Sequence, residues 1–230
     1  KIKINELKTV GVHVDALLKI SHNAHIITEK HINEDSNFDK IGSTKSGIRP
    51  VYRDKYDREG TRICDLRLDE LFPYIGDIQV VDLYELFKST DKILGEGAQG
   101  FELDIDYGNY PFVTSSNCIS SGVCTSCIPF KSIEKIYGIC KIYDTYVGNR
   151  PFQGDDDDFK RLSILGEEIG ATTSRQRQIN WLNITKLKKA ILVNSVTHLI
   201  INKCDIIQQL NVYKLIDNDQ IIEFSNFKEM

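Results

Sequence analysis

Residues 172–207, TTSRQRQINWLNITKLKKAILVNSVTHLIINKCDII, contain the succession of elements that decides the fold. A loop with two arginines comes first, and the apolar residues that follow predict a helix over Ile184 to Asn194. The run THLIINK then predicts a buried strand, and the tetrad Asn202 to Asp205 stands at its end. A helix followed by such a strand is typical of an α/β fold.

The tetrad has the pattern N-K-x-D and is a candidate site for reading guanine. In open α/β sheets, the carboxyl ends of the strands are where ligands bind. Asp205 can accept hydrogen bonds from the ring N–H and the exocyclic amine of guanine, while the stem of Lys203 packs along the purine face. Adenine presents the opposite pattern of donors and acceptors. The alternative is an ordinary salt bridge at the end of a strand.

The arginine loop, GATTSRQR, is a candidate site for small anions. The guanidinium groups of Arg175 and Arg177 stand beside the hydroxyls of Thr172 and Thr173. Such groups suit the bidentate capture of carboxylates or phosphates. The alternative is a solvated basic loop.

Two other segments suit parts of a nucleotide. Ser43, Thr44 and Arg58 are able to hold a phosphate, with the backbone N–H of Gly42 assisting. The stretch EGAQGFELDIDYGNYPFVTSSN, residues 96–117, contains no Lys, Arg or His. It offers small residues for close backbone approach and neutral donors for a planar polar ligand, but no positive charge for phosphate.

Composition limits the class of protein and its partners. The chain has 230 residues, of which 41% are apolar and 27% charged, with a net charge of -4. These values are ordinary for a soluble globular protein and predict no broad basic field, so we expect no nucleic-acid partner. No stretch approaches the roughly 18 apolar residues of a membrane span, and no secretory signal is present. We therefore expect a cytoplasmic protein without a membrane partner, folded as a single domain.

The six cysteines predict free thiols, because the chain is large and lacks an export signal. The pair in CTSC, Cys124 and Cys127, has the spacing of a zinc knuckle, with Cys118 nearby. No second C-x-x-C and no close histidine supplies a fourth ligand. We expect no metal site in residues 1–230. The chain also has no G-x-x-x-x-G-K-[ST] or G-x-G-x-x-G motif. The candidate guanine site at the N-K-x-D tetrad therefore has no matching phosphate-binding loop within residues 1–230.

Five segments of the chain resemble adenylosuccinate synthetase and follow one another in the same order as in that family. Their amino-acid sequences are most similar to the eukaryotic branch of the family. They are IGSTKSGIRPVYRDKYDREGTRICDL, EGAQGFELDIDYGNYPFVTSSNCISSGVCT, KIYDTYVGNRPF, GATTSRQRQINWL and INKCD. Together they extend over nearly the whole chain. Several long motifs in the correct order make the resemblance specific.

The resemblance implies a ligase of purine biosynthesis that uses GTP as a co-substrate. GTP phosphorylates the 6-oxygen of IMP, and the amino group of L-aspartate then displaces phosphate to give adenylosuccinate. The residues that match IMP-binding positions are Thr44, Arg58, Gln99, Leu103, Thr114, Val147 and Gly148. Those that match aspartate-binding positions are Thr172, Thr173 and Arg175, and those that match GTP-binding positions are Arg177, Lys203 and Asp205.

Within the IMP set the resemblance implies separate roles. Gln99 would contact the base, Leu103 would pack beside it, and Thr44 and Thr114 would bind the phosphate. Val147 and Gly148 would lie on the ribose side. Arg58 would reach the IMP of the partner, so we expect a homodimer.

The resemblance also implies a fold and a gap. We expect a largely parallel central sheet flanked by helices, related to the P-loop GTPases, in a single synthetase-like domain over residues 1–230. That domain is expected to be a fragment without the family's N-terminal phosphate loop and C-terminal end. The general base, the general acid and the Mg²⁺ ligands are expected in the part that is lacking, so no catalytic residue is assigned. Ser174, Gln176 and Gln178 depart from the family pattern, the last two by replacing basic residues.

Two alternatives stay open. One is the related phage synthetase that ligates aspartate to dGMP on the path to 2-aminoadenine. The other is a catalytically dead remnant that binds nucleotide.

Overall fold

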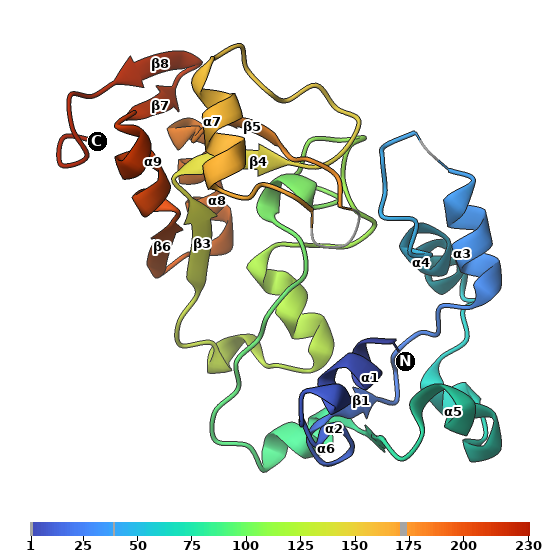
Figure 1. Ribbon diagram of the computed structural model, residues 1–230. Helices are drawn as coiled ribbons and strands as arrows, with labels where there is room; N and C mark the ends of the chain where they lie inside the picture. Colours follow the sequence, from blue (N-terminus) through green and yellow to red (C-terminus); the bar gives the residue numbers. More distant parts are fainter. Residues whose placement is uncertain (1, 39, 171–173) are drawn as a thin grey trace. The chain divides into compact units, whose positions relative to one another are not determined.

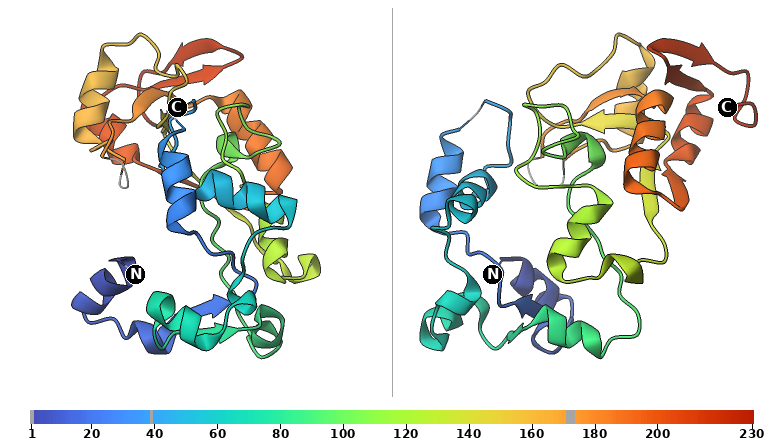
Figure 2. Two further views of the ribbon diagram at one scale, coloured as in Figure 1. Left: turned by 90° about the vertical axis from the view of Figure 1, so that its right-hand side faces the viewer. Right: turned by 180° about the vertical axis from the view of Figure 1, so that it is seen from behind.

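The computed structural model describes residues 2–38, 40–170 and 174–230 of the chain (Figure 1). Its contacts divide the chain into two compact units, and Figure 2 gives two further views of the ribbon. Unit 1 comprises residues 1–38, 45–96 and 123–129, and unit 2 comprises residues 39–44, 97–122 and 130–230. The single-domain organisation stays a prediction. Within the described ranges, no helix has the length and apolar character needed to cross a membrane.

Unit 1 is built from short helices and one pair of strands. The strands β1 (Lys19–Ser21) and β2 (Gln79–Val81) pair in parallel. The helices are α1 (Ile2–Thr9), α2 (Val14–Leu17), α3 (Glu29–Ser36), α4 (Ile48–Asp57), α5 (Leu68–Ile75) and α6 (Leu83–Lys88), with the 3-10 turn η1 (Ile63–Asp65).

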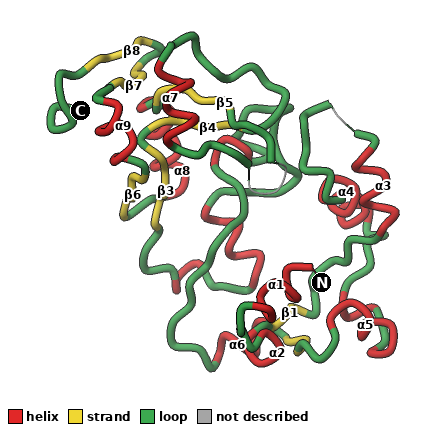
Figure 3. Tube along the Cα trace, viewed as in Figure 1, coloured by secondary structure: helices red, strands yellow, loops and turns green. Residues whose placement is uncertain are grey.

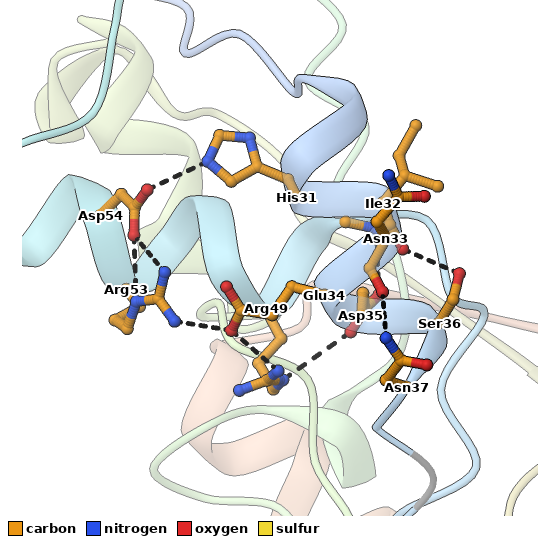
Figure 4. Close-up of polar contacts among 11 residues, drawn as sticks. His31, Ile32, Asn33, Glu34, Asp35, Ser36, Asn37, Arg49, Arg53 and Asp54 are labelled. Carbon is orange, nitrogen blue, oxygen red and sulfur yellow. Dashed lines mark hydrogen bonds and ion pairs between the residues drawn. The ribbon is translucent and has the colours of Figure 1, made fainter.

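Charged side chains join α3 to α4 in unit 1, as Figure 4 shows. From α4, Arg53 donates to Glu34 at 2.6 Å, and Asp54 lies 3.0 Å from Nε2 of the buried His31. Nδ1 of that histidine accepts from the backbone N–H of Thr28 at 3.0 Å, so Nε2 carries the hydrogen and donates it in a hydrogen bond to Asp54. These contacts fix α4 against α3.

Unit 2 carries the larger apolar core and three strand pairs, which are yellow in Figure 3. Strand β3 (Tyr137–Lys141) pairs in parallel with β6 (His198–Asn202). Strand β4 (Tyr143–Tyr146) is antiparallel to β5 (Gln178–Trp181), and β7 (Lys214–Asp217) is antiparallel to β8 (Gln220–Glu223). The helices are α7 (Asp158–Leu165), α8 (Ile184–Asn194) and α9 (Cys204–Leu210), and the 3-10 turns are η2 (Phe101–Leu103), η4 (Phe130–Ser132) and η3 (Ser120–Ser126), the last of which runs on into unit 1.

The helices and parallel strands confirm the predicted α/β class. The helix predicted over Ile184 to Asn194 is α8, with the predicted bounds. The prediction that the strand before the N-K-x-D tetrad is buried is wrong, because all five residues of β6 are exposed. Apolar composition alone predicted burial there, and burial depends on which elements cover a strand.

The core of unit 2 lies between α7, α9 and the β4–β5 pair (Figure 1). Trp181 is 1% exposed, and its ring lies 5.0 Å from that of Phe159. Its indole N–H donates to Asp156 at 3.0 Å, and Lys214 donates to the same carboxyl oxygen at 3.0 Å. The carboxylate of Asp156 is therefore a structural part of this core.

Candidate functional site

The acidic loop of residues 97–122 is organised by one buried carboxylate. Asp104 is 0% exposed and accepts the backbone N–H groups of four residues. The donors are Asp106 at 2.9 Å, Tyr107 at 3.0 Å, Cys118 at 2.5 Å and Ile119 at 3.2 Å. Burial opposes ionisation, but these hydrogen bonds outweigh it and lower the pKa of Asp104. The loop is thus folded around a fixed negative charge.

Three of the predicted IMP residues belong to this loop. The backbone N–H of Thr114 donates to the carbonyl of Leu103 at 2.8 Å, so these two residues are adjacent. Gln99 is exposed and has a φ of 64°, in the left-handed region. The loop therefore presents an exposed amide just before the turn η2 and a hydroxyl beside its end.

The segment Val147 to Gln153 follows β4 and lies beside that loop. The guanidinium of Arg150 is stacked on the rings of Tyr146, at 4.9 Å, and Phe152, at 5.3 Å. One of its nitrogens lies 3.8 Å from the carboxylate of Glu102 in the acidic loop. The segment that carries the predicted ribose-side residues Val147 and Gly148 is thereby linked to the acidic loop.

Gly148 has no room for a side chain. A Cβ at this position would collide with the hydroxyl of Tyr146. The absence of a side chain leaves the backbone of Gly148 accessible to a close neighbour.

The third segment of the site joins residues 41–44 to the arginine loop. Nη2 of Arg175 donates to the carbonyl of Gly42 at 2.8 Å, and Thr44 follows two residues later. The N–H of Asn149 donates to the carbonyl of Ile41 at 3.4 Å. Gly42 has a φ of +71° and its missing Cβ would lie 2.6 Å from the amide oxygen of Asn149. Thr44 and Arg175 therefore belong to one cluster with residues 147–153.

Arg177 is fixed by a buried carboxylate. Glu168 is 0% exposed and accepts from Lys141 at 2.6 Å, from the hydroxyl of Tyr143 at 2.7 Å and from Arg177 at 2.8 Å. Burial opposes ionisation here too, but these three donors lower the pKa of Glu168. Burial and the neighbouring Glu168 raise the pKa of Tyr143, which stays a hydroxyl donor.

The N-K-x-D tetrad lies against the same network. Nζ of Lys203 donates to the carbonyl of Gly166 at 3.0 Å, two residues before Glu168. Lys203 has a φ of 63° and precedes the first residue of α9. Asp205 is exposed in the first turn of that helix. The structure therefore brings Lys203 and Asp205 to the same part of unit 2 as Arg177.

The remaining predicted residues are Thr172, Thr173 and Arg58. Thr172 and Thr173 lie outside the described residues. Arg58 belongs to unit 1, where it ends α4 with a φ of 66°. The carbonyl of Asp54 accepts from the N–H groups of Glu59 and Gly60, so the α3–α4 contacts also hold the turn that carries Arg58. Its role across a dimer stays a prediction.

Asp144, on β4, is a largely buried carboxyl group whose ionisation is unfavourable. Its carboxylate accepts from the N–H of Asn183 at 3.1 Å. Burial raises its pKa from 3.8 to about 6, the nearby Glu102 adds to the rise, and the hydrogen bond from Asn183 opposes it. A raised pKa means that folding favours the protonated form. Unfolding therefore becomes easier as the pH rises from 3.8 towards about 6.

We expect Asp144→Asn to stabilise the protein at about pH 7.5, by up to about 3 kcal/mol, because the amide removes the cost of burying a charge. Near pH 4 the variant and the wild type are expected to unfold at the same urea concentration. Urea unfolding at the two pH values measures this. The exposed Asp155→Asn is the control, and an equal effect at both pH values would contradict the assignment.

Sequence reasoning missed the groups that hold the site together. Asp104 was one carboxylate among several in the loop, and Glu168 was one of two adjacent glutamates. Gln178 appeared only as a departure from the family pattern. No local pattern distinguishes a buried carboxylate from an exposed neighbour, because its partners come from distant segments.

Comparisons with known proteins find a matching family model, similar sequences and similar solved structures. A family model described as adenylosuccinate synthetase matches residues 2–77 and 67–218. The adenylosuccinate synthetases of Chlorobium phaeovibrioides and Phocaeicola vulgatus are 35% and 34% identical to the chain over 96% and 93% of it. The chain spans 64% and 62% of the lengths of these two relatives. Both are bacterial, so the likeness to the eukaryotic branch stays a prediction.

Two solved structures are similar to this one. A fully ligated adenylosuccinate synthetase from Plasmodium falciparum matches with a TM-score of 0.85 and 28% identity, over 98% of this chain and 66% of that one. The succinoaminodeoxyadenylate synthetase PurZ of cyanophage S-2L, bound to dGMP and dATP, matches with a TM-score of 0.69 and 25% identity. That second match covers 86% of this chain and 61% of the phage chain.

Proposed function

The chain belongs to the adenylosuccinate synthetase family, and we propose from this that it serves the GTP-dependent ligation of L-aspartate to IMP. In this reaction GTP phosphorylates the 6-oxygen of IMP, and the amino group of aspartate displaces the phosphate. The product is adenylosuccinate, on the route to AMP.

One observation carries the proposal. Residues that are expected to bind different parts of IMP and aspartate are linked by direct contacts within unit 2. Arg150 reaches Glu102, Asn149 donates to Ile41, and Arg175 donates to Gly42. These contacts connect the acidic loop, residues 147–153, residues 41–44 and the arginine loop, four segments that are far apart in the sequence.

The chemistry of the linked segments fits the division of labour. Neutral donors such as Gln99 suit hypoxanthine, which is uncharged and presents both donors and acceptors. The guanidinium of Arg175 suits the carboxylates of aspartate. Phosphoryl transfer to a carbonyl oxygen depends on alignment and charge neutralisation more than on a covalent nucleophile. The positioning of the three substrates is therefore the contribution that we assign to these residues.

Magnesium supplies charge neutralisation for GTP in this family. Within residues 2–38, 40–170 and 174–230, no group of three or more His, Cys, Asp or Glu is arranged to hold a metal ion. Mg²⁺ usually binds through one or two carboxylates together with the phosphates of the nucleotide, so we assign no residue of this chain to it.

The homodimer is part of the same proposal. Arg58 is exposed at the end of α4, and the α3–α4 contacts hold its turn in place. An exposed, well-supported arginine is able to enter a neighbouring subunit's site and contact an anion there.

The use of dGMP in place of IMP has less support. The phage structure resembles the chain less closely than the Plasmodium enzyme does, in TM-score and in coverage. A remnant that binds nucleotide without turnover is separated from both enzymes by a direct assay.

The test is phosphate release by the product of the complete reading frame, supplied with GTP, Mg²⁺, aspartate and either IMP or dGMP. We expect release that requires both IMP and aspartate and that accompanies adenylosuccinate formation. Turnover that occurs with dGMP but not with IMP, or nucleotide binding without turnover, would contradict the proposal.

A matched pair of variants tests the guanine site in the same assay. Asp205→Asn replaces an acceptor by a donor and is expected to lose GTP-driven turnover. Asp219→Asn, at an exposed position in the β7–β8 turn, is expected to keep it.

A further inference from the structure

The side chain of Gln178 is bonded to the backbone of one loop at four points. Gln178 begins β5, opposite Tyr146 at the end of β4, so the chain that leaves β4 passes directly by it. Its Nε2 donates to the carbonyls of Gly148 at 3.2 Å and Arg150 at 2.9 Å. Its Oε1 accepts from the N–H groups of Phe152 at 2.9 Å and Gln153 at 3.2 Å.

These bonds take the place of secondary structure. Residues 147–153, all of them described, contain neither helix nor strand. Backbone groups in such a segment need partners from elsewhere. An amide side chain offers both donors and acceptors, and Gln178 uses both ends on the same loop. It therefore fixes the path of the loop from Gly148 to Gln153.

A second residue of β5 supports the loop from the same side. Nδ2 of Asn180 donates to the carbonyl of Phe152 at 3.0 Å. Residues two apart on a strand face the same way, so Gln178 and Asn180 act on the loop together. With Phe152 held, the guanidinium of Arg150 keeps its contacts with the rings of Tyr146 and Phe152 and stays 3.8 Å from the carboxylate of Glu102.

We propose that Gln178 is a positioning residue for the purine nucleoside monophosphate: it holds Val147 and Gly148 where they meet the ribose. The inference rests on the proposed function, because the ribose-side role of these two residues comes with it. Gln178 touches no reacting atom. Its loss is expected to weaken IMP binding while leaving GTP binding and the chemical step nearly unchanged.

The test compares Gln178→Met with Gln176→Met in the product of the complete reading frame. Methionine has a similar length but forms none of the four hydrogen bonds. Gln176 is the control, because its amide donates to the hydroxyl of Ser163 at 2.9 Å and not to the loop. We expect the KM for IMP to rise about tenfold or more in Gln178→Met, with kcat and the KM for GTP within about twofold of the control. Amide exchange at Phe152 and Gln153 is expected to accelerate by a similar factor.

Three outcomes would overturn the inference. They are a KM for IMP within about twofold of the control, an equal rise in the KM values for IMP and GTP, and unchanged amide exchange at Phe152 and Gln153. If Gln178→Met does not fold, Gln178→Glu takes its place, since it keeps the acceptor for these two amides and loses the donors. Calorimetric titration with IMP needs no turnover, so it judges the role of Gln178 even if the wild type fails to form adenylosuccinate.

Discussion

Replacing Glu168 with alanine is expected to lower the free energy of unfolding by about 3 to 5 kcal/mol, because removing one partner of a buried ion pair leaves uncompensated charge. Glu168 is 0% exposed, and Lys141 and Arg177, which it neutralises, are only 23% and 29% exposed. The hydroxyl of Tyr143 would also lose its acceptor. Denaturant unfolding of the variant and the wild type measures the loss.

The adjacent glutamate provides the control. Glu167 is exposed, and Glu167→Ala is expected to change stability by less than about 0.5 kcal/mol. The pH dependence of the difference in unfolding free energy between the wild type and Glu168→Ala gives a second check, because folding lowers the pKa of Glu168. Its contribution is present above the ordinary value of 4.5 and is lost as the pH falls through the lowered value. Equal losses for the two alanine variants would show that the network does not hold this region.

Asp104→Asn is expected to lower the free energy of unfolding by about 3 kcal/mol or more. It is also expected to raise the dissociation constant of IMP by about tenfold or more. The carboxylate accepts four backbone N–H groups, whereas an amide presents its own N–H₂ to some of them and leaves those donors unpaired. The loop that carries Gln99, Leu103 and Thr114 then loses hydrogen bonds that fix its backbone. Unfolding in urea and calorimetry with IMP measure the two effects.

Asp106→Asn is the matched control for this loop. The carboxylate of Asp106 is exposed and accepts only from the amide of Asn117, at 2.8 Å, among the contacts that the structure gives it. We expect Asp106→Asn to lower the free energy of unfolding by less than about 1 kcal/mol. A similar cost for both variants would mean that the loop does not depend on the buried charge.

Two elements of unit 2, α8 and β6, follow from local patterns in the sequence. The helix α8 has apolar residues at helical spacing and an Asn183 cap, whose side chain accepts from the N–H of Lys186 at 3.0 Å. The strand β6 is a run of apolar residues. Both were predicted from their apolar residues, because such patterns are properties of neighbouring residues. The exposure of β6 was not, because it depends on elements distant in the chain.

The candidate site divides in the same way. Resemblance predicted which residues face the ligands, and the structure brings Thr44, Leu103, Thr114, Gly148 and Arg175 into one linked set of segments. The resemblance did not predict which side chains hold these segments in place. The carboxylates of Asp104 and Glu168 and the amide of Gln178 act through contacts with residues far away in sequence, and their residue types alone do not reveal burial.

The central claim is that unit 2 holds IMP at residues 97–122, 147–153 and 42–44, and guanine at the N-K-x-D tetrad. Hydrogen exchange of the intact protein, with and without each nucleotide, tests it most directly. We predict that IMP slows exchange in those three segments and that GTP slows it over residues 203–206. Slowing by IMP that is confined to other residues, or unchanged exchange at saturating IMP, would contradict the claim.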